Sequence, residues 1–358
     1  MNCFTIIIPT HNRHDYLRRN LCYLNTFENF FDIVVLDSSN EEFIYLNEFE
    51  CRIKYRHSPG LNFYGKFFDI KKFIETEYVL ICADDDFVIL ESVLEIIKYL
   101  DKNREYGSGQ GVSQSFFLNK NNKLSKFNTY NNMVEDYIND DSSSNRILHF
   151  MKNYIYPTHY SVIRTTIFIK IFDKLSSQDN IFLYYSQLYE FLLPLYLIIE
   201  SKHFVHNIFY YAREIIFNSS GHLIITVDEV ITNKKYKNDY NIFLSSVSEY
   251  LSRIENINLN DARKIIEEAI QVYVYCFLPE FHKLKILKKI FYKKKIIHIV
   301  FFLYRIILKI ITKIKLDRLF HLRIKNLIRQ YSYISENNKS EEKYWSLIEM
   351  FILKHSSS

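Results

Sequence analysis

The sequence predicts an α/β protein in which short strands alternate with helices around a mainly parallel sheet. Two observations support this fold class. Short apolar runs, most of them β-branched, lie at residues 4–8, 33–36, 53–55 and 78–83. Between and after these runs, several segments carry apolar residues at helical spacing. Strands that alternate with helices in this way favour a parallel sheet.

The predicted elements follow one another in a simple order along the first hundred residues. They are a strand at 4–8, a helix with Leu17, Leu21 and Leu24 on one face, a strand at 33–36, a weaker strand at 53–55, a helix at 63–75, a strand at 78–83 and a helix at 92–100. Pro9 ends the first strand, and a Pro59-Gly60 turn precedes the second helix.

The later part of the chain changes character twice. Residues 119–145 are rich in Asn, Lys, Ser and Asp and predict an exposed excursion or flexible loop. A very apolar stretch predicts a helix at 188–199, which Pro194 is expected to kink or interrupt. From about residue 231 the pattern is helical throughout, so we predict an α/β domain at 1–230 and a helical region at 231–358.

Polar side chains follow three of the predicted strands, at the point where each strand ends. They are Pro9-Thr10, Asp37 and the three aspartates Asp84 to Asp86 in the stretch LICADDDFVI. Ligands of open α/β sheets bind at the carboxyl ends of the strands, so these clusters predict one site. Carboxylates suit Mg²⁺ or Mn²⁺, and the alternative is a solvated turn with a cap for the next helix.

Charge is distributed very unevenly along the chain. The formal net charge is +5, but residues 281–329 contain fifteen Lys or Arg and one acid, Asp317. Within this segment, residues 296–316 have the spacing of a basic amphipathic helix, which predicts contact with an anionic membrane surface by the segment 281–330. A packed core helix is the alternative. Nucleic-acid binding ranks lower because no nucleic-acid module accompanies the charge.

Cysteine usage and the N-terminus indicate a cytoplasmic protein. The five cysteines are scattered without a CxxC pair, which is typical of reduced thiols and not of a disulfide framework or a zinc site. The first ten residues have no basic stretch or cleavage site, so we expect no signal peptide. No apolar run reaches about 18 residues, so we expect no transmembrane helix.

Four motifs in order give a family resemblance. IPTHNR at 8–13, VVLDSS at 34–39, HSPGLNFYGK at 57–66 and YVLICADDDF at 78–87 together resemble a glycosyltransferase of the GT-A fold, similar to family 2. The resemblance is closer to a bacterial subfamily with CADDDF in place of LDADD. It implies a Rossmann-like mixed sheet flanked by helices, with a C-terminal helical basic extension.

The resemblance also implies an activity. The expected reaction moves a sugar from a nucleotide-sugar, with a UDP-sugar favoured, to a surface glycan such as lipopolysaccharide, capsule or a lipid-linked oligosaccharide. Inversion at the anomeric carbon is favoured by the resemblance alone. The expected location is the cytoplasm, on the inner face of the cell membrane. Alternatives are a non-catalytic scaffold of a glycan assembly complex and a nucleotidyltransferase, although IPTHNR lacks the glycines of the latter.

The resemblance carries specific roles onto this chain. The implied nucleotide-sugar-binding residues are Pro9, Thr10, Asn12, Arg13, Asp37, Lys66, Asp84 and Asp85. Asp84 and Asp86 are the implied ligands of Mn²⁺ or Mg²⁺, and Phe87 stands where a further acid is common. On an extended chain Asp85 points away from its neighbours, which indicates a structural role.

Simpler roles remain open for several of these residues. Thr10 and Asn12 also suit helix capping, Asp37 a turn, and Lys66 a solvated surface position.

A general base is the remaining part of an inverting mechanism, and Glu190 is our candidate. The family places an acid on a helix well downstream of the metal motif, and Glu190 lies in a very apolar helical stretch. Burial there is expected to raise its pKa towards the operating range. The alternative is that Glu190 pairs with an arginine or caps a backbone group. Asp179 and Glu200 are weaker candidates.

Overall fold

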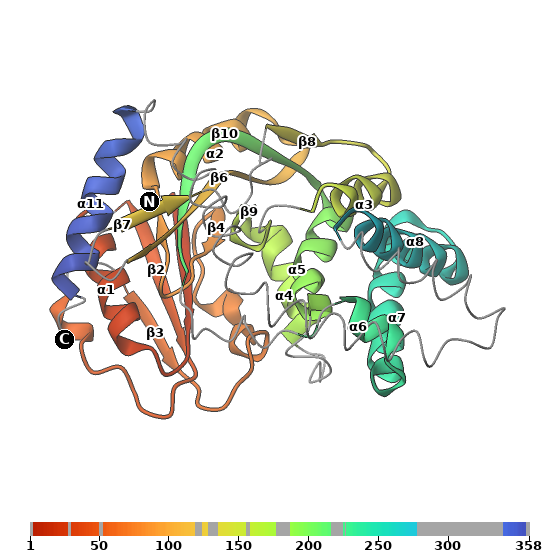
Figure 1. Ribbon diagram of the computed structural model, residues 1–358, viewed down its shortest axis with the longest axis horizontal. Helices are drawn as coiled ribbons and strands as arrows, with labels where there is room; N and C mark the ends of the chain where they lie inside the picture. Colours follow the sequence, from red (N-terminus) through yellow and green to blue (C-terminus); the bar gives the residue numbers. More distant parts are fainter. Residues whose placement is uncertain are drawn as a thin grey trace, which may run out of the picture.

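A mixed sheet with helices on both faces forms the centre of the protein, as the sequence predicted (Figure 1). The computed structural model describes residues 3–27, 30–49, 53–118, 124–127, 135–154, 158–176, 187–215, 225, 227–277 and 339–355. The strands are β1 (Phe4–Thr10), β2 (Phe31–Asp37), β3 (Ile53–His57), β4 (Tyr78–Ile81), β5 (Phe87–Val88), β6 (Tyr106–Leu118), β7 (Leu124–Phe127), β8 (Asp136–Ile138), β9 (Val162–Arg164) and β10 (Lys202–Glu214). The helices are α1 (His14–Leu24), α2 (Leu90–Lys102), α3 (Ser143–Lys152), α4 (Thr165–Ser176), α5 (Gln187–Glu200), α6 (Val227–Thr232), α7 (Lys237–Glu255), α8 (Leu259–Phe277) and α11 (Lys339–His355).

The first four strands of the chain, β1 to β4, lie next to one another in the sheet. The strand order runs β3-β2-β1-β4-β9-β6-β10-β5, with β7 paired to β6 and β8 paired to β10. Strands β3, β2, β1 and β4 are parallel to one another. Strand β9 is antiparallel to both of its neighbours, while β6 and β10 are parallel. The N-terminal half of the sheet is therefore the parallel unit that the alternating pattern predicted. The antiparallel strands β5, β7, β8 and β9 make the sheet mixed.

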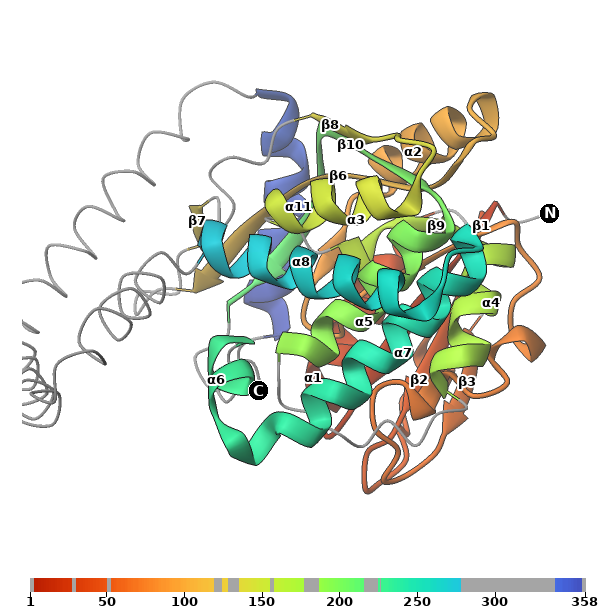
Figure 2. The same ribbon diagram turned by 90° about the vertical axis from the view of Figure 1, so that its right-hand side faces the viewer.

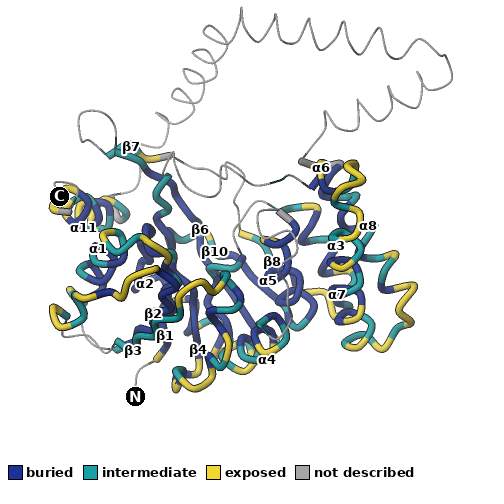
Figure 3. The backbone as a smooth tube through the Cα atoms, turned by 90° about the horizontal axis from the view of Figure 1, so that it is seen from below, coloured by how far each residue is buried: buried dark blue, intermediate teal, exposed yellow. Residues whose placement is uncertain are grey.

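Each face of the sheet is buried under its own group of helices. Along β1, Ile6 and Ile8 join a core with α1, α2 and α11, whereas Ile7 points to the other face and joins a core with α4 and α5. Helices α3, α7 and α8 extend the second core (Figure 2). Burial on both faces explains why these strands have uninterrupted apolar runs and not an alternating pattern. The inner strands are buried along most of their length (Figure 3).

Helix α11 returns the C-terminal end of the chain to the core beneath α1. Trp345 is 3% exposed and stacks on Phe209 of β10, with ring centroids 5.1 Å apart. The indole Nε1 donates to Gln114 Oε1 at 3.3 Å, and Phe351 meets Tyr23 of α1 edge to face. The last helix is thus part of the same packed unit as the N-terminal strands.

Two predictions about the C-terminal half remain predictions. The proposed membrane-facing segment 281–330 lies outside the described residues, and the domain boundary at residue 230 is not tested by the packing alone. None of the described helices is long and apolar enough to cross a membrane.

The structure corrects the sequence prediction in three places. The helix expected at 63–75 is absent, and two short 3₁₀ helices, Gly65–Phe67 and Ile70–Lys72, lie there. Asp69 separates them with a φ of 55°, which interrupts a right-handed helix. The excursion predicted at 119–145 includes β7, β8 and the start of α3. Helix α5 (Gln187–Glu200) confirms the helix predicted at 188–199, and it continues through Pro194 without the interruption that was one of the two expected effects.

The long strand β6 had no clear sequence signal because it is rich in small and polar residues. Its partner β10 places the Phe204 ring directly opposite Gly109. A Cβ atom at Gly109 would lie 2.2 Å from that ring, so only glycine allows this close approach. Packing against β10, and not strand propensity, therefore explains the small residue at this position of β6.

Candidate active site

The parallel register brings the predicted polar strand ends to one edge of the sheet. Thr10 of β1 pairs with Asp37 of β2, which in turn pairs with His57 of β3. The aspartates follow β4, the other neighbour of β1. The Thr10 hydroxyl donates to Asp84 Oδ2 at 2.7 Å, so two of the clusters are in direct contact. The convergence that the sequence predicted is confirmed.

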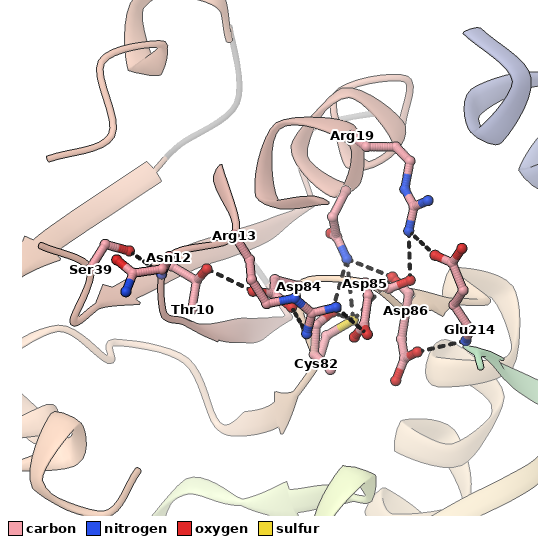
Figure 4. Close-up of polar contacts among 12 residues, drawn as sticks. Thr10, Asn12, Arg13, Arg19, Ser39, Cys82, Asp84, Asp85, Asp86 and Glu214 are labelled. Atoms are coloured by element: carbon pink, nitrogen blue, oxygen red, sulfur yellow. Dashed lines mark hydrogen bonds and ion pairs between the residues drawn. The ribbon is translucent and has the colours of Figure 1, made fainter. Parts of the chain in front are cut away.

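The loop after β1 is joined to the loop after β2 through Asn12. Asn12 has a φ of 53°, a conformation that asparagine tolerates better than most residues. Its backbone N–H donates to Ser39 Oγ at 2.7 Å (Figure 4). Its Oδ1 accepts from the Asn40 N–H at 2.9 Å. Arg13 is the N-cap residue of α1 and makes no side-chain capping bond. Neither Thr10 nor Asn12 therefore caps that helix, and both instead shape the site.

Arg13 forms ion pairs with two of the three aspartates. Its Nη1 lies 3.0 Å from Asp84 Oδ1, and its Nη2 lies 2.6 Å from Asp85 Oδ2 (Figure 4). The expectation that Asp85 points away from Asp84 is wrong. It assumed an extended chain, but the Asp86 N–H donates to Ala83 O at 3.2 Å and turns the backbone. Burial raises the pKa of Asp84 to about 6, and the charge of Arg13 opposes that rise.

Asp86 is buried, and the described part of the chain gives it no direct ion pair. Its carboxylate is 2% exposed and forms no ion pair with any residue that the structure describes. Asp86 Oδ1 accepts the backbone N–H of Glu214 at 2.8 Å (Figure 4). Burial raises the pKa of Asp86 well above its usual range, the charge of Asp85 adds to the rise, and Arg213 opposes it. A buried carboxylate of this kind calls for a cation.

Residues that the sequence analysis did not assign hold the aspartate turn in place. Arg19 Nη2 donates to Asp85 O at 2.8 Å and pairs with Glu214 at the end of β10. Asn20 Nδ2 donates to Asp86 O at 2.6 Å. A signal for Asn20 existed in the sequence, because it lies three residues after Leu17 and four before Leu24, within the apolar stripe of α1. Arg19 and Glu214 gave none, since they are 195 residues apart.

Asp37 is a charged acceptor with three donors already in place. Asp37 Oδ1 accepts the Ser39 N–H at 2.8 Å, while Oδ2 accepts the Tyr55 hydroxyl at 2.9 Å and lies 3.1 Å from His14 Nε2. Burial would raise its pKa, but these hydrogen bonds outweigh burial and lower it. The carboxylate stays ionised. The Ser39 hydroxyl also bonds to this carboxylate, so the neighbouring residues together use about four acceptor positions.

Lys66 is buried, and the surface role considered for it is wrong. The side chain lies inside the protein, and Nζ donates to Thr10 O at 2.6 Å. Burial lowers its pKa to about 8, and the charges of Asp84 and Asp37 limit the fall. Lys66 therefore places a positive charge behind the loop that follows β1, although it comes from a segment about 56 residues away.

Glu190 lies in the first turn of α5 and reaches solvent. Surrounding protein atoms nevertheless exclude enough water to raise the pKa of its carboxyl, and the charge of Arg213 opposes this rise. Arg213 acts in the same direction on Asp86. The candidate base and the aspartate cluster thus lie within electrostatic reach of one arginine. No hydrogen bond or ion pair joins Glu190 to another described residue.

The donor set is suited to a hard divalent cation that keeps other ligands. The described part of the chain contains no group of three or more His, Cys, Asp and Glu side chains that could hold a metal ion. Asp84 and Asp86 could supply two carboxylates. Mg²⁺ usually takes one or two carboxylates and completes its octahedron with phosphate oxygens and water. The arrangement therefore fits an ion that binds together with a diphosphate, and not a metal cage made by protein alone.

The mixed sheet flanked by helices is a GT-A-like fold, and the match of its N-terminal part to a family model identifies a glycosyltransferase. Residues 5–172 match the family model described as Glycosyl transferase family 2. The matched residues include the strand ends and the aspartates, and they stop before Glu190. No curated protein matches the chain.

Solved structures with a similar fold include those of S. aureus TarS. The structure of TarS 1-349 is 14% identical, with a TM-score of 0.43, and the match covers 76% of this chain and 89% of that one. TarS 1-349 in complex with UDP is 15% identical, with a TM-score of 0.45, over 76% of this chain and 72% of that one. A TarS complex with UDP-GlcNAc matches with a TM-score of 0.43 and 13% identity, over 76% and 89%.

Proposed function

We propose that this glycosyltransferase takes its sugar from a nucleotide-sugar, with a UDP-sugar favoured, and depends on Mn²⁺ or Mg²⁺. Asp86 is the main support for this proposal, because it is a buried carboxylate that forms no ion pair with a described residue, beside Asp84 at the edge of the parallel strands. Asp84 and Asp86 would hold the ion, which supplies charge neutralisation to the departing diphosphate when bound.

The surrounding residues suit a nucleoside diphosphate. Pro9, Thr10 and Asn12 shape the loop against which the nucleoside would lie. Asp37, at the end of β2, would lie beside the base. Lys66 and Arg13 are cations that contact the strand ends, and both suit the phosphates. These assignments also favour an enzymatic function over a non-catalytic scaffold function. Buried charges at the strand ends are costly, and a scaffold would not require them.

Glu190 would act as the general base of an inverting transfer. The carboxylate takes the proton of the acceptor hydroxyl as that oxygen bonds to the anomeric carbon. The bond from the anomeric carbon to the phosphate oxygen breaks, and the nucleoside diphosphate leaves with the electron pair. The position of Glu190, reachable from solvent yet with a raised pKa, suits this role because an acceptor can approach it.

Glu190→Gln is expected to lower the rate of sugar transfer by about 10²- to 10⁴-fold while UDP binding stays unchanged. Glutamine keeps the shape of the side chain and cannot take a proton. In the wild type, transfer should also fall as the pH falls through the raised pKa of Glu190, since only the carboxylate is a base. Asp173→Asn, an exposed acid on α4, is the control. Full activity of Glu190→Gln would mean that another residue is the base.

The acceptor that we propose is a surface glycan or a lipid-linked oligosaccharide at the inner face of the cell membrane. The fifteen basic residues of 281–329 support this, because anionic lipid attracts such segments. The full chain should therefore sediment with vesicles that contain anionic lipid and not with neutral vesicles. Deletion of 281–330 should abolish the binding. Vesicle binding that survives the deletion would contradict the role of this segment.

Calorimetric titration with UDP and with GDP, each in Mn²⁺ and in EDTA, tests the proposed donor and metal. We expect UDP to bind in Mn²⁺ and to bind far more weakly in EDTA. Binding of GDP alone would change the donor but keep the site. Absence of metal-dependent binding by UDP, GDP, CMP and dTDP would remove the metal and the nucleotide-sugar from the proposal.

A further inference from the structure

We propose that Arg13 holds the place of the metal ion in the donor-free enzyme, and that the nucleoside diphosphate releases it. The inference rests on the proposed function, because it concerns access to the proposed metal ligands. Arg13 would act as a positioning residue with two partners. It pairs with carboxylates when the site is empty of donor, and with phosphate when donor is bound.

The contacts of Asp84 show why the ion cannot simply bind. Asp84 Oδ1 pairs with Arg13 Nη1 at 3.0 Å, and Asp84 Oδ2 accepts from Thr10 at 2.7 Å. Each oxygen therefore already has one partner. The same guanidinium also neutralises Asp85 through Nη2 at 2.6 Å. A divalent ion at Asp84 would compete with Arg13 for one oxygen and would repel its charge at short range.

Arg13 is placed so that it can move, whereas its neighbour Arg19 is not. The Arg13 side chain is 32% exposed and lies over the Tyr16 ring at 4.5 Å. The Arg19 side chain is 8% exposed and is fixed between Asp85 O and Glu214. Arginine forms bidentate contacts with phosphate as readily as with carboxylate. A bound diphosphate thus offers Arg13 an equivalent partner on the solvent side of the site.

This exchange couples metal binding to nucleotide binding. Without nucleotide, an incoming ion has to displace a charged guanidinium that then has no anion. With nucleotide, the displaced guanidinium gains phosphate, so the ion and the diphosphate strengthen each other's binding. Linkage makes that effect reciprocal. The enzyme would therefore take up the metal with its donor and hold little metal beforehand.

The test is Mn²⁺ titration followed by the electron paramagnetic resonance signal of the free ion, with and without UDP. We expect Arg13→Gln to bind Mn²⁺ about tenfold more tightly than the wild type without UDP. The gain in Mn²⁺ affinity on adding UDP should shrink by a similar factor. Arg18→Gln is the matched control, because Arg18 lies on the same helix and pairs with Glu48 at the surface. It should behave as the wild type does.

Loss of Arg13 leaves buried carboxylates unpaired, so a second variant keeps the test decisive if Arg13→Gln folds poorly. Arg13→Gln with Asp85→Asn removes one charge of each sign and should show the same gain in Mn²⁺ affinity without UDP. Unchanged or weaker Mn²⁺ binding by the folded variants, with normal binding by the wild type in UDP, overturns this inference alone. Absence of Mn²⁺ binding by every protein, with UDP present, overturns the proposed metal site as well.

Discussion

Asp86→Asn is expected to reduce sugar transfer by about 10³-fold or more and to abolish the metal dependence of UDP binding. A metal that stabilises the leaving diphosphate contributes several kcal/mol to the transition state, and about 4 kcal/mol corresponds to that factor. Asparagine keeps the shape of the side chain, and its Oδ1 can still accept the Glu214 N–H. The substitution therefore removes the charge and leaves the turn intact. UDP release and calorimetry measure the two effects.

Asp69→Asn is a suitable control for this prediction. Asp69 lies in a nearby loop, pairs with Lys72 on the surface and has a positive φ that asparagine also tolerates. It should retain wild-type transfer. If Asp86→Asn kept transfer within about tenfold of the wild type and still bound UDP only with Mn²⁺, the metal would have to lie elsewhere.

Trp345→Ala is expected to lower the free energy of unfolding by about 3–5 kcal/mol. The indole is 3% exposed, stacks on Phe209 and meets Phe116 edge to face with centroids 5.8 Å apart. Its removal leaves a cavity between α11 and the sheet and an unpaired Gln114 carbonyl. Urea unfolding of the full chain measures the change.

Met350→Ala, on the same helix, separates loss of packing from a general effect on α11. Met350 is 52% exposed, and its truncation should change stability by less than about 0.5 kcal/mol.

Helix α11 packs on α1, which carries Arg19 and Asn20, so Trp345→Ala should also loosen the aspartate turn and weaken UDP binding. Equal unfolding midpoints for Trp345→Ala and the wild type would show that α11 adds nothing to the domain.

The fold could be predicted from the sequence where local pattern and burial agree. Strands β1, β2 and β4 have apolar runs because both faces of the sheet are covered, and α1 and α2 have one apolar face. The prediction for 63–75 was wrong because the apolar spacing there fits an α-helix. The segment instead forms two short 3₁₀ helices on either side of Asp69. Strand β6 was missed because a small residue is needed where the Phe204 ring of the neighbouring strand packs against it, and small residues give no strand signal.

The site could be predicted only in outline. Thr10, Asp37 and the three aspartates follow strands, and parallel strands bring their ends to one edge whatever the remaining fold. The pairing of Arg13 with Asp84 and Asp85 could not be read from the sequence, because it depends on the turn at Ala83–Asp86. Burial of Lys66 was equally hidden, since an isolated lysine carries no sign of what covers it.

The order of residue types is thus enough to place carboxylates at the carboxyl ends of strands. The apolar pattern that predicts a strand involves only residues close together in the chain. The partners of those carboxylates follow from tertiary structure alone. Glu214 reaches Asp86 and Arg19 from the far end of β10, and α11 packs beneath α1 from more than 300 residues away in the sequence. Such contacts depend on how the layers pack, and no local pattern records which distant side chain will meet a buried charge.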